Sequence, residues 1–147
     1  MTSRLDQIPH RLREIITDFA SSEGREKLEL LLQYAEELPP LPDWLSDKST
    51  MNQVEECMTP VFLHAAQQNW KMTFHFDVPR SSPTVRGFAT ILKEGLDDLT
   101  PEEVLAVPGD CLEQMGLQEV LTYQRMNGIT AMLAHMKQLA LREIESS

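Results

Sequence analysis

Residues 61–78 read VFLHAAQQNWKMTFHFDV and hold two apolar–polar alternations separated by a short polar stretch. Alternation over residues 61–66 and again over 72–78 is typical of strands with one buried face. Because the connection at residues 67–70 is so short, we expect the two strands to form an antiparallel hairpin. Residues 51–54 predict a third strand just before it.

Helical periodicity precedes the hairpin. One apolar series predicts an amphipathic helix at the start of the chain, with Leu5, Ile8, Leu12, Ile15, Ile16 and Phe19 on one face. A second helix is expected after an N-cap at Ser22, and its apolar side holds Leu28, Leu31, Leu32, Ala35 and Leu38. It must end at the prolines of residues 39–42, which remove backbone donors. Trp44 and Leu45 are the large anchors of the loop that follows.

Helical periodicity also returns after the hairpin. Ser81 or Ser82 is expected to cap a helix with Pro83 in its first turn, and its inward residues are Val85, Phe88, Ala89, Leu92 and Leu96. Residues 100–103 read Thr-Pro-Glu-Glu, which predicts a capping box and a short helix through Val107.

The chain is expected to close with a short turn and a long helix. The turn holds Leu112 and Met115, and the helix over residues 123–145 presents Met126, Ile129, Leu133, Met136 and Ala140 on one face. Helices before and after a small antiparallel sheet predict an α+β fold. A length of 147 residues fits one domain, which we expect to span residues 1–147.

The net charge of −10 argues against nucleic acid as a partner, because an acidic surface repels phosphate backbones. The apolar runs are too short to cross a bilayer, and the N-terminus lacks the pattern of a signal peptide. We therefore expect a cytoplasmic protein with no membrane partner, as a monomer or weak homodimer.

Two cysteines, Cys57 and Cys111, are too few for a disulfide framework or a four-thiolate metal site. Cys111 is expected to be a buried structural residue. Cys57 lies just before a predicted strand, so we expect it on a loop that a rigid sheet supports. Its neighbours Glu55 and Glu56 are negative charges that raise the pKa of a thiol.

Cys57 is therefore the candidate reactive residue, and several roles remain open for it. One is a thiol-dependent enzyme in which His64 or His75 serves as the base. These two histidines fall on facing strands, but no carboxylate stands at ligand spacing, so we expect no metal site. A non-catalytic adaptor is another alternative. A cluster scaffold is disfavoured, because it needs about three thiolates or equivalent ligands.

Several collinear segments resemble the SufE family. Residues 54–62, Val-Glu-Glu-Cys-Met-Thr-Pro-Val-Phe, are similar to the family signature, in which Gly-Cys-x-Ser-x-Val precedes an aromatic residue. Residues 34–42 resemble the family helix that ends in Leu-Pro. Similar segments follow in the same order, namely Val85-Arg86-Gly87, the Leu-Thr-Pro-Glu-Glu of residues 99–103, Gly116-Leu117 and the Leu-Thr-x-x-Arg-x-x-Gly of residues 121–128.

The resemblance implies a fold like that of IscU-type scaffold proteins. It also implies that Cys57 accepts persulfide sulfur from a pyridoxal-phosphate-dependent cysteine desulfurase of the SufS type, stimulates that enzyme and passes sulfur to an iron–sulfur scaffold. Such a protein is a sulfur carrier without a cofactor of its own, because the pyridoxal chemistry belongs to the partner.

Two positions near the cysteine stand out in this resemblance. Arg125 matches the family arginine near the sulfur loop, where its charge would stabilise a thiolate or perthiolate. Glu56 occupies the place of the family glycine before the cysteine, and a left-handed backbone there would be strained by about 1 kcal/mol.

Overall fold

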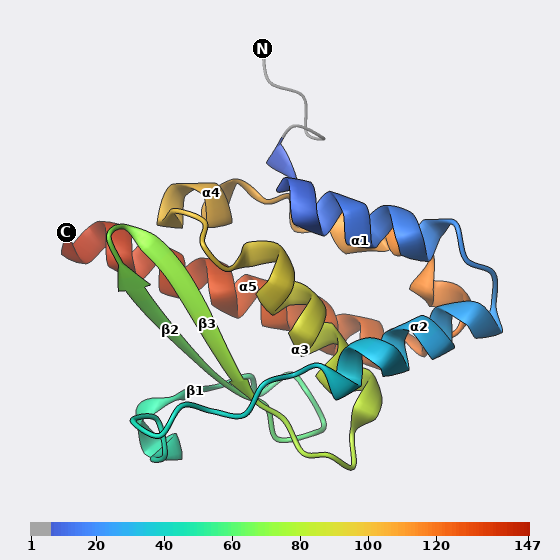
Figure 1. The fold of residues 1–147 in the computed structure, drawn as a ribbon, viewed down its shortest axis with the longest axis horizontal. Helices are drawn as coiled ribbons and strands as arrows, with labels where there is room; N and C mark the ends of the chain where they lie inside the picture. The colour runs from blue at the N-terminus through green and yellow to red at the C-terminus, as the bar shows by residue number, and fades with distance from the viewer. Residues whose placement is uncertain (1–6) are drawn as a thin grey trace.

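The structure is a computed structural model that describes residues 7–147. Along the chain, helices precede and follow a three-stranded antiparallel sheet (Figure 1). The predicted α+β fold is therefore confirmed. The elements before the last helices are α1 His10–Ala20, α2 Arg25–Glu36, the 3-10 turn η2 Lys48–Thr50, β1 Asn52–Gln53, β2 Phe62–Gln68 and β3 Lys71–Asp77. The remaining elements are α3 Pro83–Leu96, α4 Pro101–Ala106, the 3-10 turns η3 Cys111–Met115 and η4 Leu117–Glu119, and α5 Tyr123–Ser146.

The sheet has the order β1-β2-β3, and both pairs of neighbours are antiparallel. Leu63 lies opposite Phe76 and Ala65 lies opposite Phe74, so these side chains share one face of the sheet. Leu63, Phe74 and Phe76 are buried. The predicted antiparallel hairpin with one buried face is therefore present.

The hairpin turn is tighter than predicted. β2 runs on to Gln68, which pairs with Lys71, and only Asn69 and Trp70 remain in the turn. Both have left-handed backbones, with φ of 54° and 62°, as a two-residue turn of the primed type requires. A left-handed tryptophan is unusual. Its indole nitrogen donates a hydrogen bond of 2.7 Å to Glu102, which ties the turn to α4.

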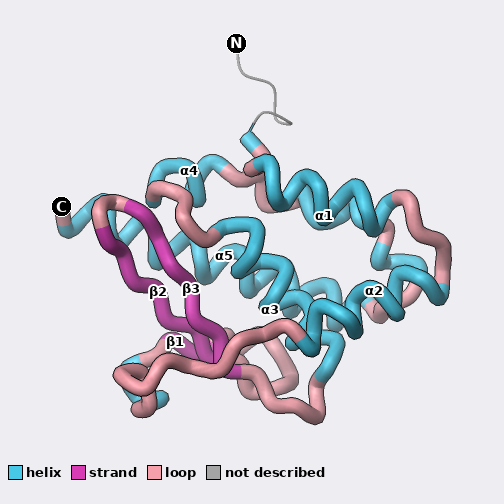
Figure 2. Tube along the Cα trace, viewed as in Figure 1, coloured by secondary structure: helices cyan, strands magenta, loops and turns pink. Residues whose placement is uncertain are grey.

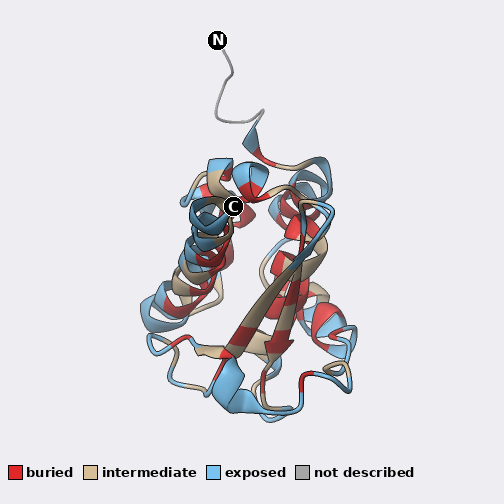
Figure 3. Ribbon diagram, turned by 90° about the vertical axis from the view of Figure 1, so that its left-hand side faces the viewer, coloured by how far each residue is buried: buried red, intermediate tan, exposed pale blue. Residues whose placement is uncertain are grey.

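Two helices cover the sheet and form the core with it. α3 packs against β3, and α5 packs against β2 (Figure 2). Figure 3 shows buried residues gathered on the sides of the helices and strands that face one another. Phe74 and Phe88 are fully buried where the sheet meets α3. Within the described part of the chain, no helix is long and apolar enough to span a membrane.

The N-terminal helices agree with the predicted periodicity except at Leu32, and the predicted N-cap of α2 is wrong. The apolar residues of α1 are buried as expected, while Leu5 lies outside the described residues. Leu32 is 45% exposed, so its assignment to the buried side of α2 was wrong. Ser22 is not the N-cap of α2, because the helix begins one residue after Gly24 and the Ser22 hydroxyl instead donates to the Asp18 carbonyl of α1.

Of the two helix N-caps predicted after the hairpin, the one at α4 forms its side-chain hydrogen bonds and the one at α3 does not. The capping box at Thr100 and Glu103 is present with both of its hydrogen bonds, as predicted. Ser82 occupies the N-cap position of α3, but its hydroxyl makes no capping bond. It lies 2.9 Å from the hydroxyl of Thr59 instead, which links α3 to the loop before β2.

Gly87→Ala should destabilise the protein, because α2 and α3 cross at this glycine. A methyl group there would overlap the backbone carbonyl and side chain of Leu31. We expect a loss of about 1–3 kcal/mol in the free energy of unfolding, measured by urea denaturation. Gly109→Ala is the matched control, since nothing lies within 4 Å of its added methyl group. Equal midpoints for the two variants would contradict this account of the crossing.

Candidate functional site

Cys57 lies in the loop that joins β1 to β2. Val54 donates a 2.9 Å hydrogen bond to the Val61 carbonyl, which closes the base of this loop as an extension of the strand pair. Within it, the Cys57 amide donates to the Val54 carbonyl at 3.2 Å. Val54 and Val61 are both fully buried. The cysteine therefore sits at the tip of a short loop whose two ends are fixed in the core, as the sequence predicted.

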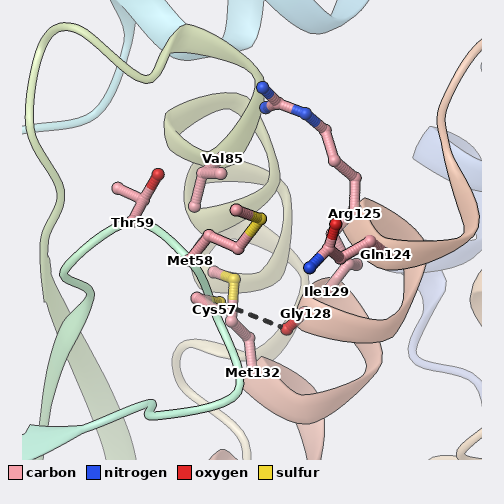
Figure 4. Close-up of a pocket in the computed structure, with 9 residues that line it drawn as sticks. All are labelled: Cys57, Met58, Thr59, Val85, Gln124, Arg125, Gly128, Ile129 and Met132. Carbon is pink, nitrogen blue, oxygen red and sulfur yellow. Dashed lines mark hydrogen bonds between the residues drawn. The ribbon is translucent and has the colours of Figure 1, made fainter.

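The tip of the loop lies against α5. The Cys57 sulfur is 3.5 Å from the backbone carbonyl of Gly128, to which the thiol donates a hydrogen bond (Figure 4). A Cβ atom at position 128 would lie only 3.2 Å from this sulfur and 3.7 Å from the Cys57 Cα. The absence of a side chain at Gly128 therefore lets the loop approach the helix closely.

A cavity of about 260 Å³ opens beside the thiol. Figure 4 shows the residues that line it, which come from the loop, α3 and α5: Cys57, Met58, Thr59, Val85, Gln124, Arg125, Gly128, Ile129 and Met132. Ile129 and Met132 are buried, whereas Met58 is 80% exposed. The walls are thus mainly apolar, with polar groups at Thr59, Gln124 and Arg125.

This environment keeps the thiol protonated. Partial burial raises the pKa of Cys57 above its ordinary value, and the nearby carboxylate of Glu56 raises it further. Both effects disfavour the thiolate. The expectation that acidic neighbours raise this pKa is borne out for Glu56, although burial is the larger cause. Cys57 is therefore a poor nucleophile until something changes its surroundings.

Glu56 fits the loop without the left-handed backbone that a glycine would favour. Its φ is negative, whereas the non-glycine residues with positive φ between 7 and 147 are Asn69, Trp70 and Asp98. Its carboxylate lies 3.0 Å from Nε2 of His135 on α5. A backbone hydrogen bond and this contact with His135 lower the pKa of Glu56.

Arg125 is in the first turn of α5 and lines the same cavity as Cys57. The helix begins with Thr122 as its N-cap, whose hydroxyl accepts from the Arg125 amide at 3.2 Å. The guanidinium points away from the thiol in Figure 4. The structure thus brings the two predicted site residues to one pocket, while the role of the Arg125 charge stays a prediction.

His64 and His75 lie elsewhere. They are directly paired across β2 and β3 with ring centroids 6.2 Å apart, as the sequence predicted. The exposed Trp44 contacts both rings edge-on. Neither histidine is among the described residues that line the Cys57 cavity, so this arrangement gives Cys57 no base from the sheet. Across residues 7–147, no group of three or more potential ligands could hold a metal ion.

Cys111 opens η3 and is 1% exposed, within the hydrophobic core. Its thiol is not accessible to solvent, which agrees with the structural role expected for it.

The place of several residues in the site was not predicted from the sequence. Gly128 was noted only as part of a motif, and a glycine inside a helical pattern is the signal that a close backbone contact lies there. His135 gave no signal, because its partner Glu56 is distant in sequence. Ser82 was predicted only as a helix cap, and its contact with the distant Thr59 was not.

Comparison with known proteins places the site in a family context. The family model SufE, described as an Fe-S metabolism associated domain, matches residues 13–140. An uncharacterized SufE-like protein of Mycobacterium tuberculosis is 43% identical over 139 residues, which are 94% of this chain and 96% of that protein. SufE-like protein 1, chloroplastic/mitochondrial, of Arabidopsis thaliana is 30% identical over 93% of this chain and 36% of its own length.

The fold is similar to a solved structure as well. The solution structure of a hypothetical protein from Thermus thermophilus superimposes with a TM-score of 0.82 at 34% sequence identity. The match covers 95% of this chain and 99% of that one. The similarity therefore extends over nearly the whole fold.

The raised pKa of Cys57 can be checked by alkylation with iodoacetamide as a function of pH. We expect the rate to rise with a midpoint above about 8.5, the value of an unperturbed thiol. Glu56→Gln should lower the midpoint, because it removes a negative charge beside the sulfur. Glu55→Gln is the control and should change it little, since burial and Glu56 are the causes of the shift. A midpoint well below that of a free thiol would instead favour a thiol-dependent enzyme.

Proposed function

Because this chain belongs to the SufE family, we propose that it accepts sulfur on Cys57 from the persulfide of a cysteine desulfurase and passes it to iron–sulfur cluster assembly. The observation that carries the proposal is the position of the thiol at the tip of a core-anchored loop, beside an apolar cavity. We propose a pyridoxal-phosphate-dependent enzyme of the SufS type as the sulfur donor. An iron–sulfur scaffold is the proposed acceptor.

The transfer itself is a thiol–persulfide exchange without net oxidation. The Cys57 thiolate attacks the outer sulfur of the donor persulfide, the sulfur–sulfur bond of the donor breaks, and the donor cysteine leaves as a thiolate. A new sulfur–sulfur bond forms on Cys57. The proton that Cys57 loses can be returned to the leaving thiolate, so protons and electrons balance.

A high pKa suits an acceptor of this kind. A protonated, half-buried thiol reacts slowly with oxidants and unrelated electrophiles, because the thiolate is the reactive form. The donor persulfide is already activated, so Cys57 needs its thiolate only when the partner docks. A hydrolytic cysteine, in contrast, needs a base beside it throughout its cycle.

The cavity supports the second half of the proposal. It lies directly beside the sulfur of Cys57, and Ile129 and Met132 give it apolar walls. A persulfide that turned into this space would be kept from water and small thiols. The three polar side chains on the cavity wall, Thr59, Gln124 and Arg125, are the groups able to contact its charge.

In this proposal the protein is a carrier that speeds its partner by removing sulfur from it. The pyridoxal chemistry stays on the desulfurase. We expect the exchange to take place in the cytoplasm, where reducing conditions keep thiols available, and the carrier to act as a monomer or weak homodimer.

The direct test is incubation with a cysteine desulfurase and cysteine, followed by mass spectrometry of the peptides. We expect one added sulfur atom on Cys57 that dithiothreitol removes. Cys111→Ser should keep the adduct, provided that it folds, whereas Cys57→Ser should lose it. If Cys57→Ser still binds the desulfurase while the native chain never carries sulfur, the protein is an adaptor and the proposal is wrong.

Arg125→Gln should slow sulfur transfer to Cys57. Arg125 lines the cavity, and its positive charge can stabilise the thiolate or perthiolate of Cys57 once the side chain turns inward. A loss of roughly three- to tenfold in the transfer rate is expected for removal of this one exposed charge. Arg142→Gln is the control, since this arginine of α5 contacts Asn52. Equal rates for both variants would remove Arg125 from the reaction.

A further inference from the structure

The residue before the reactive cysteine is tied to a distant part of the chain. The carboxylate of Glu56 lies 3.0 Å from Nε2 of His135, 79 positions further along, in the middle of α5. A carboxylate only accepts, so Nε2 of His135 carries the hydrogen in this contact. The bond therefore joins the cysteine loop to the helix that forms one wall of the cavity.

Other contacts hold the same loop between α3 and α5. The Cys57 thiol donates to Gly128 of α5 at 3.5 Å, which is long for an ordinary hydrogen bond but within range for sulfur. On the other side, the Thr59 hydroxyl lies 2.9 Å from that of Ser82 at the start of α3. Of the side-chain contacts at the loop tip, the one between Glu56 and His135 joins a carboxylate to an imidazole, and such charge-assisted bonds are the stronger kind.

The position of the thiol makes these contacts relevant to its access. The sulfur of Cys57 faces the backbone of Gly128 and is half-buried. The sulfur atom of a donor persulfide must reach it within bonding distance, which needs an unobstructed approach. The Val54–Val61 bond fixes the base of the loop in the core. Fuller exposure of the half-buried thiol therefore follows if the tip of the loop lifts from α5 while its base stays in place.

We propose that the Glu56–His135 pair is a latch that holds the loop tip on α5 and limits exposure of Cys57, so that His135 is a positioning residue. The side chains of Glu56 and His135 are 50% and 22% exposed, so water can replace the bond when the loop lifts. The pair can therefore open without unfolding the helix. Its role in sulfur transfer rests on the proposed function, whereas the latch itself does not.

Alkylation of Cys57 by iodoacetamide under native conditions tests the latch without any partner. His135→Phe keeps an aromatic ring but loses the donor to Glu56. It should speed the labelling roughly two- to fivefold, the range expected for the loss of one partly exposed polar contact. His135→Gln keeps a donor of similar reach and should restore most of the slow labelling. The charge of Glu56, which raises the pKa of Cys57, is present in all three proteins.

Two controls separate local release from general loss of stability. Cys111 is buried in the core, so its labelling in the same sample reports unfolding of the whole domain. It should stay unlabelled while Cys57 becomes faster. His10→Phe removes a similar exposed pair, with Glu14 on α1, and should leave the labelling of Cys57 unchanged.

Three results would overturn the latch. They are unchanged labelling of Cys57 in His135→Phe, equal acceleration of Cys57 and Cys111, and a His135→Gln variant as fast as His135→Phe. These outcomes are distinct from failure of the proposed function. A protein that never takes up sulfur from a desulfurase would still show the latch in this experiment, and a protein without the latch would still carry the sulfur adduct.

Discussion

Burial of one face of the β2–β3 hairpin against α3 and α5 determines where the other parts of this molecule lie. Leu63, Phe74 and Phe76 fill the space between the sheet and the two helices, and they fix the start of β2. The loop that carries Cys57 is the segment leading into that strand. Its position over α5 thus follows from packing in the core, and a cysteine on a long mobile loop would lack such a fixed position.

The reactivity of the Cys57 thiol depends on the partial burial of its loop. A fully buried thiol would be inert, and a fully exposed one would react with any oxidant. Cys57 lies between these limits, with a raised pKa, a cavity beside the sulfur and a carboxylate next to it. Glu56 has a double effect, because its charge disfavours the thiolate while its bond to His135 holds the loop on α5. Protection and positioning of the sulfur thus depend on the same side chain.

The sequence predicts the local structure well and the contacts between distant segments poorly. The hairpin, the capping box at Thr100 and the long last helix follow from periodicity and local hydrogen bonding, and all are present. Cys57 was identified from its place before a predicted strand and from a motif, Arg125 from a motif alone, and the two do share one cavity. Ser82 was predicted to cap α3, but Thr59 competes for its hydroxyl. Lys27 could not be anticipated either, because a lysine is seldom buried. Here its ammonium donates to the Phe19 carbonyl in the last turn of α1, which also accepts from the Ser22 amide.

The exposure of Met58 has a consequence for oxidative stress. Its thioether lies on the cavity wall but is 80% exposed, the largest exposure among the described methionines. Peroxide converts such a side chain to a sulfoxide, which is polar and chiral. The apolar mouth of the cavity would then become hydrophilic, and a methionine sulfoxide reductase could reverse the change. Oxidation of this one exposed thioether would thus change the entrance to the cavity while leaving the neighbouring cysteine itself intact.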